Sequence, residues 1–284
     1  MKYQIICDSC GDFTPEMMAD PHFVSVPLTL EIGDYRIMDD ENFDQADFLR
    51  RMAESSAGAK TACPSPDAFL KALEEAEAEE IYIVTISERL SGTYQAAKIA
   101  IEMYQEAHED SPKKIHLFDS KAGTAGECKL CLDIQDYKES DHSFLEVVDL
   151  IEKECNEMAT VFVLGSLENL RKNGRLSTMK TFIASALNIK PIMCAENGII
   201  VKLDQQRGVQ KALKRMVQIA IERAGGVEAV KEKRLVITHV NALERAEQVK
   251  ADFLKEADFK DIVITNAQGV ATIYADNQGI VVAL

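Results

Sequence analysis

The segment between residues 81 and 97 constrains the fold of this chain most strongly. An apolar, mostly β-branched run from Ile81 to Ile86 is followed by a polar turn and then by an Ala-rich stretch that starts at Tyr94. This order predicts a strand, a loop and a helix. Where a parallel strand ends and a helix begins, unpaired backbone N–H groups attract anions. Ser91-Gly92-Thr93 is therefore a candidate anion cradle, with an ordinary helix cap as the alternative.

The same alternation of apolar runs and helical stretches recurs along the rest of the chain. We expect further strands at 3–7, 114–118, 160–164, 234–240 and 262–266, and helices at 44–55, 66–78, 94–108, 143–158, 208–224 and 243–255. Residues 271–283 look strand-like on both sides of Asp276. Because the pattern restarts near residue 159, we expect an α/β protein of two lobes, 1–158 and 159–284, with the ligand between them.

Small polar side chains follow several of the expected strands. Asp8 and Ser9 come directly after the first strand, and Asp119 and Ser120 follow the strand at 114–118. Together with Ser91, these loops indicate one shared rim at the carboxyl edge of a parallel sheet. Thr61 precedes a corner made rigid by Pro64 and Pro66, so its hydroxyl could face a cavity, although an isolated Thr is more often a plain loop residue.

Charge and composition narrow the class of partner. Apolar residues make up 46% of the 284 residues, enough for a large core. The net charge of −15 disfavours nucleic acid, which needs a basic face. The positive residues nevertheless gather in one stretch: Arg171, Lys172, Arg175, Lys180, Lys190, Lys202, Arg207, Lys211, Lys214 and Arg215. Such a stretch either steers an anionic partner or consists of scattered solvated side chains.

The apolar runs and the cysteines indicate the cellular compartment and whether a metal is expected. No apolar run reaches the ~18–20 residues needed to span a bilayer, so we expect a cytoplasmic protein without stable membrane insertion. Seven cysteines without framework spacing fit a reducing compartment. The pairs Cys7-x-x-Cys10 and Cys128-x-x-Cys131 lie far apart in the chain, so we interpret them as structural thiols and expect neither a metal nor a cofactor.

Several motifs together match a known family. They occur in the family's order and extend over nearly the whole chain, about residues 3–283: Asp8-Ser9, Thr61-Ala62-Cys63-Pro64, Leu90-Ser91-Gly92-Thr93-Tyr94, Phe118-Asp119-Ser120-Lys121, Leu167 to Ser177, Leu187-Asn188-Ile189-Lys190-Pro191-Ile192 and Arg207. The Ser-Gly-Thr-Tyr block and the Gly-Arg-Leu-Ser…Asn-Ile-Lys-Pro block are specific in combination. On these residues the chain resembles the DegV family.

The resemblance implies a two-domain α/β protein that buries a long-chain fatty acid in a tunnel between its lobes. It implies that Thr61 and Ser91, with Gly92, Thr93 and Tyr274 beside them, bind the carboxylate, and that Asp8, Ser9, Asp119 and Ser120 support the loops. Family members are acyl-presenting subunits of bacterial fatty acid kinase, whose kinase subunit makes an acyl-phosphate for an acyltransferase of phospholipid synthesis. A carrier rather than an enzyme is therefore expected, docking through Arg171, Lys172, Arg175 and Arg207.

The chain departs from the family pattern at two places. Ala62-Cys63 stands where the family usually has Ser-Gln, and Tyr274 stands where it has a histidine before a glycine-rich turn. A tyrosine hydroxyl can donate a hydrogen bond but cannot become a cation near neutral pH as imidazole can. Asp276 would repel a carboxylate if it faced the same mouth.

Two other functions compete with fatty acid binding. One is a divergent member that binds another amphiphile or an anion because of Tyr274 and Asp276. The other is a small-molecule phosphotransferase, prompted by the family's structural likeness to dihydroxyacetone kinase domains. Against the second, the sequence has no Walker P-loop and no clustered carboxylates that clearly form a Mg²⁺ site.

Overall fold

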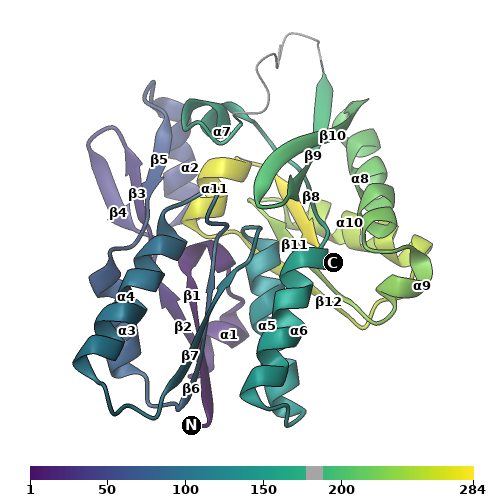
Figure 1. Ribbon diagram of the computed structural model, residues 1–284. Helices are drawn as coiled ribbons and strands as arrows, with labels where there is room; N and C mark the ends of the chain where they lie inside the picture. Colours follow the sequence, from purple (N-terminus) through teal and green to yellow (C-terminus); the bar gives the residue numbers. More distant parts are fainter. Residues whose placement is uncertain (177–187) are drawn as a thin grey trace.

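The computed structural model describes residues 1–176 and 188–284 and arranges the strands in three sheets (Figure 1). The first is a parallel four-stranded sheet in the order β2-β1-β6-β7. Its strands are β1 (Tyr3–Asp8), β2 (Phe23–Val26), β6 (Glu80–Thr85) and β7 (Lys114–Asp119). β1 is buried along its whole length, which explains why it is a continuous apolar run rather than an alternating one.

Helices cover both faces of the four-stranded sheet. On one face α3 (Pro66–Glu75) packs against α4 (Thr93–Ala107) in a core that includes Ile6, Phe69 and Ala97. On the other face lie α5 (Ala125–Glu139) and α6 (Phe144–Glu157), which Figure 1 shows between this sheet and the next. The short helices η1 (Ser9–Gly11) and α1 (Pro15–Ala19) follow β1.

The second sheet is mixed and six-stranded, in the order β10-β9-β8-β13-β11-β12. Its strands are β8 (Thr160–Val163), β9 (Ile189–Glu196), β10 (Ile199–Arg207), β11 (Arg234–His239), β12 (Asp261–Asn266) and β13 (Ile280–Ala283). Helices α8 (Val209–Arg223) and α10 (Leu243–Glu256) pack on its outer face, α9 (Val227–Val230) connects α8 to β11, and α7 (Glu168–Lys172) follows β8. All strands predicted between residues 160 and 266 are confirmed within a few residues.

A small antiparallel sheet, β4-β3-β5, stands beside the other two. It consists of β3 (Thr29–Ile32), β4 (Tyr35–Met38) and β5 (Ala59–Ala62), and it shares a core with α2 (Gln45–Glu54) and α11 (Gly269–Ala275). We retain as a proposal the division into lobes at residue 158. In its support, the four-stranded sheet comes from residues before that point and the six-stranded sheet from residues after it.

Helix α5 is absent from the sequence-based expectation. It lies between the two large sheets, contacting β1 and β6 on one side and β11 and β13 on the other. Because most of its surface is buried, its sequence lacks the one-sided apolar stripe that marks a surface helix. Its buried charges are paired instead: Lys129 lies 2.6 Å from Asp133, which also binds Arg234 of β11 at 2.5 Å.

Helix α11 corrects the strand expected over residues 271–275. Asp39 accepts hydrogen bonds from the backbone N–H groups of Gly269 (2.7 Å) and Val270 (3.1 Å), and Asp12 accepts one from Gln268 (2.7 Å). These carboxylates satisfy donors that the first turn of a helix leaves unpaired. A Cβ on Gly269 would lie 2.1 Å from Leu30 Cδ1, so the helix starts where only glycine fits.

In the described part of the chain, no helix combines the length and the apolar character that crossing a membrane requires.

Candidate functional site

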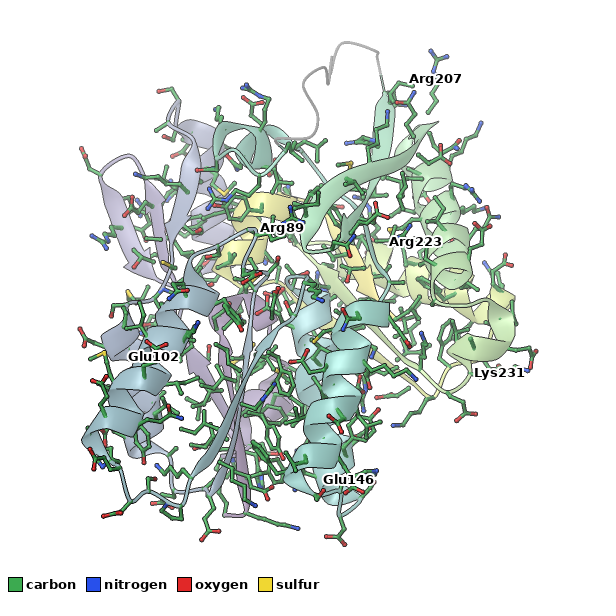
Figure 2. All side chains as sticks on the ribbon, in the orientation of Figure 1. Arg89, Glu102, Glu146, Arg207, Arg223 and Lys231 are labelled. Carbon is green, nitrogen blue, oxygen red and sulfur yellow. The ribbon has the colours of Figure 1, made fainter. Side chains whose placement is uncertain are left out.

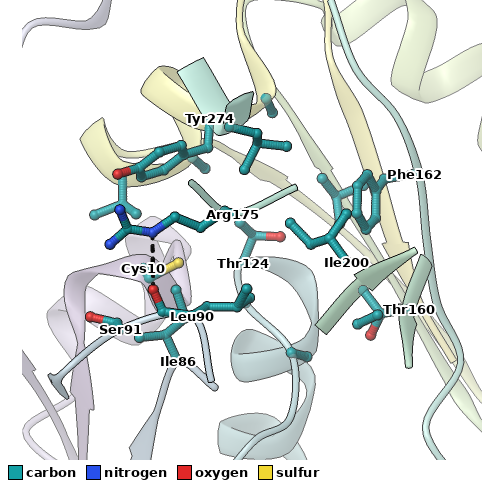
Figure 3. Close-up of a pocket in the computed structure, with 18 of the residues that line it drawn as sticks. Cys10, Ile86, Leu90, Ser91, Thr124, Thr160, Phe162, Arg175, Ile200 and Tyr274 are labelled. Carbon is teal, nitrogen blue, oxygen red and sulfur yellow. Dashed lines mark hydrogen bonds between the residues drawn. The ribbon is translucent and has the colours of Figure 1, made fainter. Parts of the chain in front are cut away.

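A largely apolar cavity lies between the two large sheets (Figure 3). Its wall comes from loops after β6 and β7, from β5, β8, β9, β10 and β13, and from α11. The apolar lining includes Leu28, Ile86, Leu90, Phe162, Leu164, Leu170, Ile200, Val270 and Val281. A cavity with such an apolar lining suits a hydrocarbon ligand.

Hydroxyl groups gather at one end of the cavity. Thr61 Oγ1 and Tyr274 Oη lie 3.1 Å apart, and Ser91 Oγ lies 2.8 Å from Thr93 Oγ1. Thr61, Ser91 and Tyr274 line the cavity, whereas Thr93 is fully buried and supports Ser91. Without a ligand one hydroxyl of each pair donates to the other, and each O–H can rotate to donate to an anion instead. This end of the cavity can therefore receive an anion.

Arg175 adds a positive charge at the hydroxyl end. Its Nε donates to Leu90 O at 3.1 Å, its Nη1 donates to Asn173 O at 2.6 Å, and its Cζ lies 6.0 Å from the centre of the Tyr274 ring. Sequence analysis assigned this residue to a docking face, whereas the structure includes it in the cavity wall beside Tyr274 and Ser91 (Figure 3). Its sequence motif gave no signal of that orientation.

Ser87 holds the Ser91 loop in place. Its backbone carbonyl accepts from the N–H groups of Leu90 (2.9 Å) and Ser91 (3.1 Å), which closes a tight turn. Its Oγ donates to Gly198 O at 2.8 Å, and so fixes the loop to the tip of the β9–β10 hairpin. Arg89 reaches the same tip through Asn197 O at 3.1 Å, where Figure 2 shows it. Sequence reasoning treated Ser87 only as part of the turn.

Gly92 lies at the start of α4, close to the Thr61 segment. A Cβ at this position would lie 3.4 Å from Cys63 Sγ, an ordinary van der Waals contact. Of the five residues expected at the carboxylate, Thr61, Ser91 and Tyr274 line the cavity, and Gly92 and Thr93 follow Ser91 in the chain.

Asp8 and Ser9 brace the loops under the cavity. Asp8 accepts from the N–H groups of Cys10 (3.0 Å) and Ile86 (2.8 Å), which ties β1 to the loop after β6. Ser9 Oγ donates to Asp39 at 2.8 Å, and Asp39 in turn holds the start of α11. Asp39 was not identified from the sequence, because its role depends on a contact 230 residues away.

Asp119 and Ser120 shape the loop after β7. Asp119 Oδ1 accepts from the N–H groups of Glu88 (3.2 Å) and Lys121 (3.0 Å). Ser120 Oγ accepts from Ala122 N–H at 3.1 Å. Neither side chain contributes to the described wall of the cavity, so their contacts are those of loop supports.

Buried acids form a cluster beside the cavity. Ligand atoms of Asp8, Cys10 and Glu127 lie within 4.8 Å of one another, a group whose donors could hold a metal ion. Burial raises the pKa of Glu127, with repulsion from Asp8 adding to it, and burial raises the pKa of Asp8 to about 7. Protonation can therefore keep these buried carboxyl groups neutral without a bound cation. The expectation of no metal stays a prediction.

The residues expected to dock a partner differ in their surroundings. Arg171 and Lys172 are exposed and share Glu168, at 2.7 Å and 3.7 Å. Arg207 is exposed at the end of β10 (Figure 2). Asp276 accepts from Asn277 N–H and is not among the residues of the described cavity wall. The motif residues Ser177 and Leu187, and the basic Lys180, lie outside the described residues.

Comparisons with known proteins agree on one family. A family model described as "Uncharacterised protein, DegV family" matches residues 2–283. A DegV domain-containing protein of Streptococcus pneumoniae is 32% identical over 99% of this chain and 98% of its own length.

Two solved structures are similar over the whole chain. A DegV family protein of Ruminococcus gnavus, refined with vaccenic acid, has a TM-score of 0.94 at 39% identity, with coverage of 100% and 99% of the two chains. The Fatty Acid Kinase (Fak) B3 protein of Streptococcus pneumoniae, loaded with linoleic acid, has a TM-score of 0.85 at 32% identity, with the same coverage.

Proposed function

Because this chain belongs to the DegV family, we propose that its cavity binds a long-chain fatty acid, with the carboxylate at the hydroxyl end and the acyl chain along the apolar wall. One observation supports this most: a largely apolar cavity ends at the Thr61–Tyr274 and Ser91–Thr93 hydroxyl pairs. The acids bound in the two similar structures support the same ligand class.

The apolar wall and the polar donors of the cavity contribute to ligand binding in different ways. Each buried CH₂ group contributes roughly 0.8 kcal/mol, so the apolar wall supplies most of the affinity. The carboxylate then needs donors to offset its desolvation. We assign Thr61, Ser91 and Tyr274 as those donors, with Thr93 orienting Ser91 and Gly92 beside them at the start of α4. Arg175 adds positive charge close by.

This arrangement is also compatible with modification of the bound carboxylate by a second protein. Hydroxyl donors hold a carboxylate less firmly than a bidentate guanidinium does. Two of the five N–H groups of Arg175 already point to backbone carbonyls, which limits how it can grip the ligand. The bound acid therefore keeps oxygens that a second protein can modify.

We infer from the Fak B3 likeness that this protein presents its fatty acid to a separate kinase subunit, and that the acyl-phosphate then passes to an acyltransferase. In this account the protein is a carrier and not the catalyst. We assign Arg171, Lys172 and Arg207 to the docking surface because they are exposed, while Arg175 acts from inside the cavity.

The binding proposal is tested with the double variant Thr61→Ala/Ser91→Ala. Displacement of a fluorescent fatty acid should show at least a tenfold loss of affinity, since two donors are removed and each is worth about 1 kcal/mol. The exposed Ser140→Ala variant is the matched control and should bind like the wild type. Unchanged binding by the double variant would contradict the assignment of these donors.

The carrier role is tested with labelled ATP and a purified bacterial fatty acid kinase subunit. Acyl-phosphate should form only when both proteins are present, and Arg207→Glu should slow it without changing fatty acid affinity. Acyl-phosphate formed by this protein alone would overturn the carrier assignment.

A further inference from the structure

Two threonine hydroxyls in the cavity wall have no hydrogen-bond partner within residues 1–176 and 188–284. They are Thr124 Oγ1 and Thr160 Oγ1, and both are shielded from solvent. The Thr160 residue is only 3% exposed. Buried hydroxyls in folded proteins are normally hydrogen-bonded, so these two hydroxyls are available to pair with a polar group of a ligand in the cavity.

Thr160 lies at the end of the cavity away from the hydroxyl pairs. Strand pairing places Val161 opposite Cys194, and Ala195 opposite Ile200, so Thr160 sits next to these residues in the six-stranded sheet. Figure 3 shows Thr160 close to Phe162 and Ile200, on the opposite side from Ser91. A ligand anchored by its carboxylate at Ser91 would reach Thr160 with its distal half.

Thr124 is held in an unusual backbone conformation. Its φ of 52° and ψ of −116° are unfavourable for a β-branched residue. It occupies the capping position of α5, yet its side chain makes no capping hydrogen bond. Figure 3 instead shows its hydroxyl directed toward Ile200 and Phe162. The chain therefore keeps this hydroxyl in the cavity and forgoes its use as a helix cap.

A second, polar cavity lies next to the first at Thr160. It shares Thr160 and Ala195 with the first, and is also lined by Ser120, Asn197, Lys121 and Arg223. Its two cations already have partners: Lys121 contacts Asn156 at 2.5 Å, and Arg223 lies 3.8 Å from Glu196. A neutral polar group on the ligand suits this end better than a second carboxylate.

We propose that the distal half of the cavity is a subsite for an oxygenated acyl chain, so that the preferred ligand is a long-chain hydroxy fatty acid. The inference rests on the proposed fatty acid binding and specifies its substrate class. A plain hydrocarbon chain would leave both threonine hydroxyls unpaired, whereas a chain hydroxyl both donates and accepts. Sites built to pair with a ligand hydroxyl discriminate against the analogue that lacks it.

The test compares ligands first on the unmodified protein. Affinities of stearic acid and of monohydroxystearic acids, with the hydroxyl at successive positions along the chain, are measured by displacement of a fluorescent fatty acid. At least one hydroxystearic acid in which the hydroxyl is far from the carboxylate should bind roughly tenfold more tightly, which corresponds to about 1.4 kcal/mol. If stearic acid binds as tightly as every hydroxy acid, the inference is wrong while fatty acid binding stands.

Variants then attribute the preference to the two threonines. Thr124→Val and Thr160→Val keep the side-chain volume and remove the hydroxyl, so at least one should reduce the ratio of hydroxystearic to stearic acid affinity to about one. Thr124→Ser and Thr160→Ser keep the hydroxyl and should retain the preference. A preference that survives both valine changes would overturn the assignment to these residues. Failure to bind any of the acids would instead refute the proposed function itself.

Discussion

The hydroxyl oxygens of Thr61 and Tyr274 lie 3.1 Å apart and join β5 of the small sheet to α11 near the other end of the chain. The hydroxyl end of the cavity is therefore assembled from segments 213 residues apart. Asp39 and Asp12 fix the start of α11, and so fix the position from which Tyr274 reaches Thr61.

Removing the Tyr274 hydroxyl tests its part in carboxylate binding. Tyr274→Phe keeps the ring that packs on the core but loses one donor of the pair, so fatty acid affinity should fall about fivefold, as expected for about 1 kcal/mol. Isothermal titration with a C18 acid measures this. Tyr94→Phe, on α4 and outside the described cavity wall, is the control. Equal affinity of the Tyr274 variant and the wild type would show that the hydroxyl is not a ligand.

Replacing Tyr274 with histidine adds a side chain that can become a cation. Imidazole has an ordinary pKa near 6.5, so Tyr274→His should bind fatty acid more tightly as pH falls through that value. The gain should be absent from Tyr274→Phe measured over the same pH range. A Tyr274→His variant with the same pH profile as Tyr274→Phe would indicate that this position does not face the carboxylate.

Crowding the start of α11 should destabilise the protein. In Gly269→Ala the new Cβ would lie 2.1 Å from Leu30 Cδ1 and 2.7 Å from Asp39 Oδ1. Overpacking of this kind costs typically 1–3 kcal/mol, so thermal unfolding should shift several degrees downward. In Gly58→Ala the new Cβ would crowd the flexible side chain of Lys172 and make an ordinary contact with Asn169 Oδ1 at 3.9 Å, so the Tm should stay nearly unchanged. Equal Tm values for the two variants would contradict the account of α11.

The buried carboxyl group of Glu127 should make the free energy of unfolding fall as pH rises. Burial raises the pKa of Glu127, so the folded state binds this proton more tightly than the unfolded chain does. The stabilising contribution of that proton is full below about pH 4 and is lost as pH rises toward the folded-state pKa. Glu127→Gln should therefore match the wild type near pH 4 and be more stable by at least ~1 kcal/mol near pH 8.

Urea unfolding at the two pH values measures this difference. Ser140→Ala, at the exposed end of the same helix, changes no titratable group and should show no such pH-dependent gain. A wild type that becomes more stable relative to Glu127→Gln with rising pH would reverse the predicted sign.

The sequence predicts the parallel and mixed sheets well because their strands are short apolar runs separated by helices. It misses α5, whose buried charges pair with residues such as Arg234 that are distant in sequence. It misassigns residues 271–275 as a strand, because the helix there is stabilised by Asp39 and Asp12. In both cases the deciding contacts are tertiary, and local pattern cannot reveal them.

The candidate site, like the fold, combines residues that the sequence predicts with features that only the structure shows. Thr61, Ser91 and Tyr274 are found through motifs, and the structure brings them to one end of one cavity. The inward orientation of Arg175, the Ser87–Gly198 contact and the unpaired hydroxyls of Thr124 and Thr160 depend on packing between the sheets. No spacing along the chain encodes these features.

The most direct test of fatty acid binding is mass spectrometry of the organic extract of protein purified from bacteria without detergent. We expect about one long-chain acid per chain, and its loss from the Thr61→Ala/Ser91→Ala variant. An oxygen-bearing acyl chain in that extract would further support the distal subsite. Wild-type protein that yields no fatty acid and takes up none when it is offered would contradict the central claim.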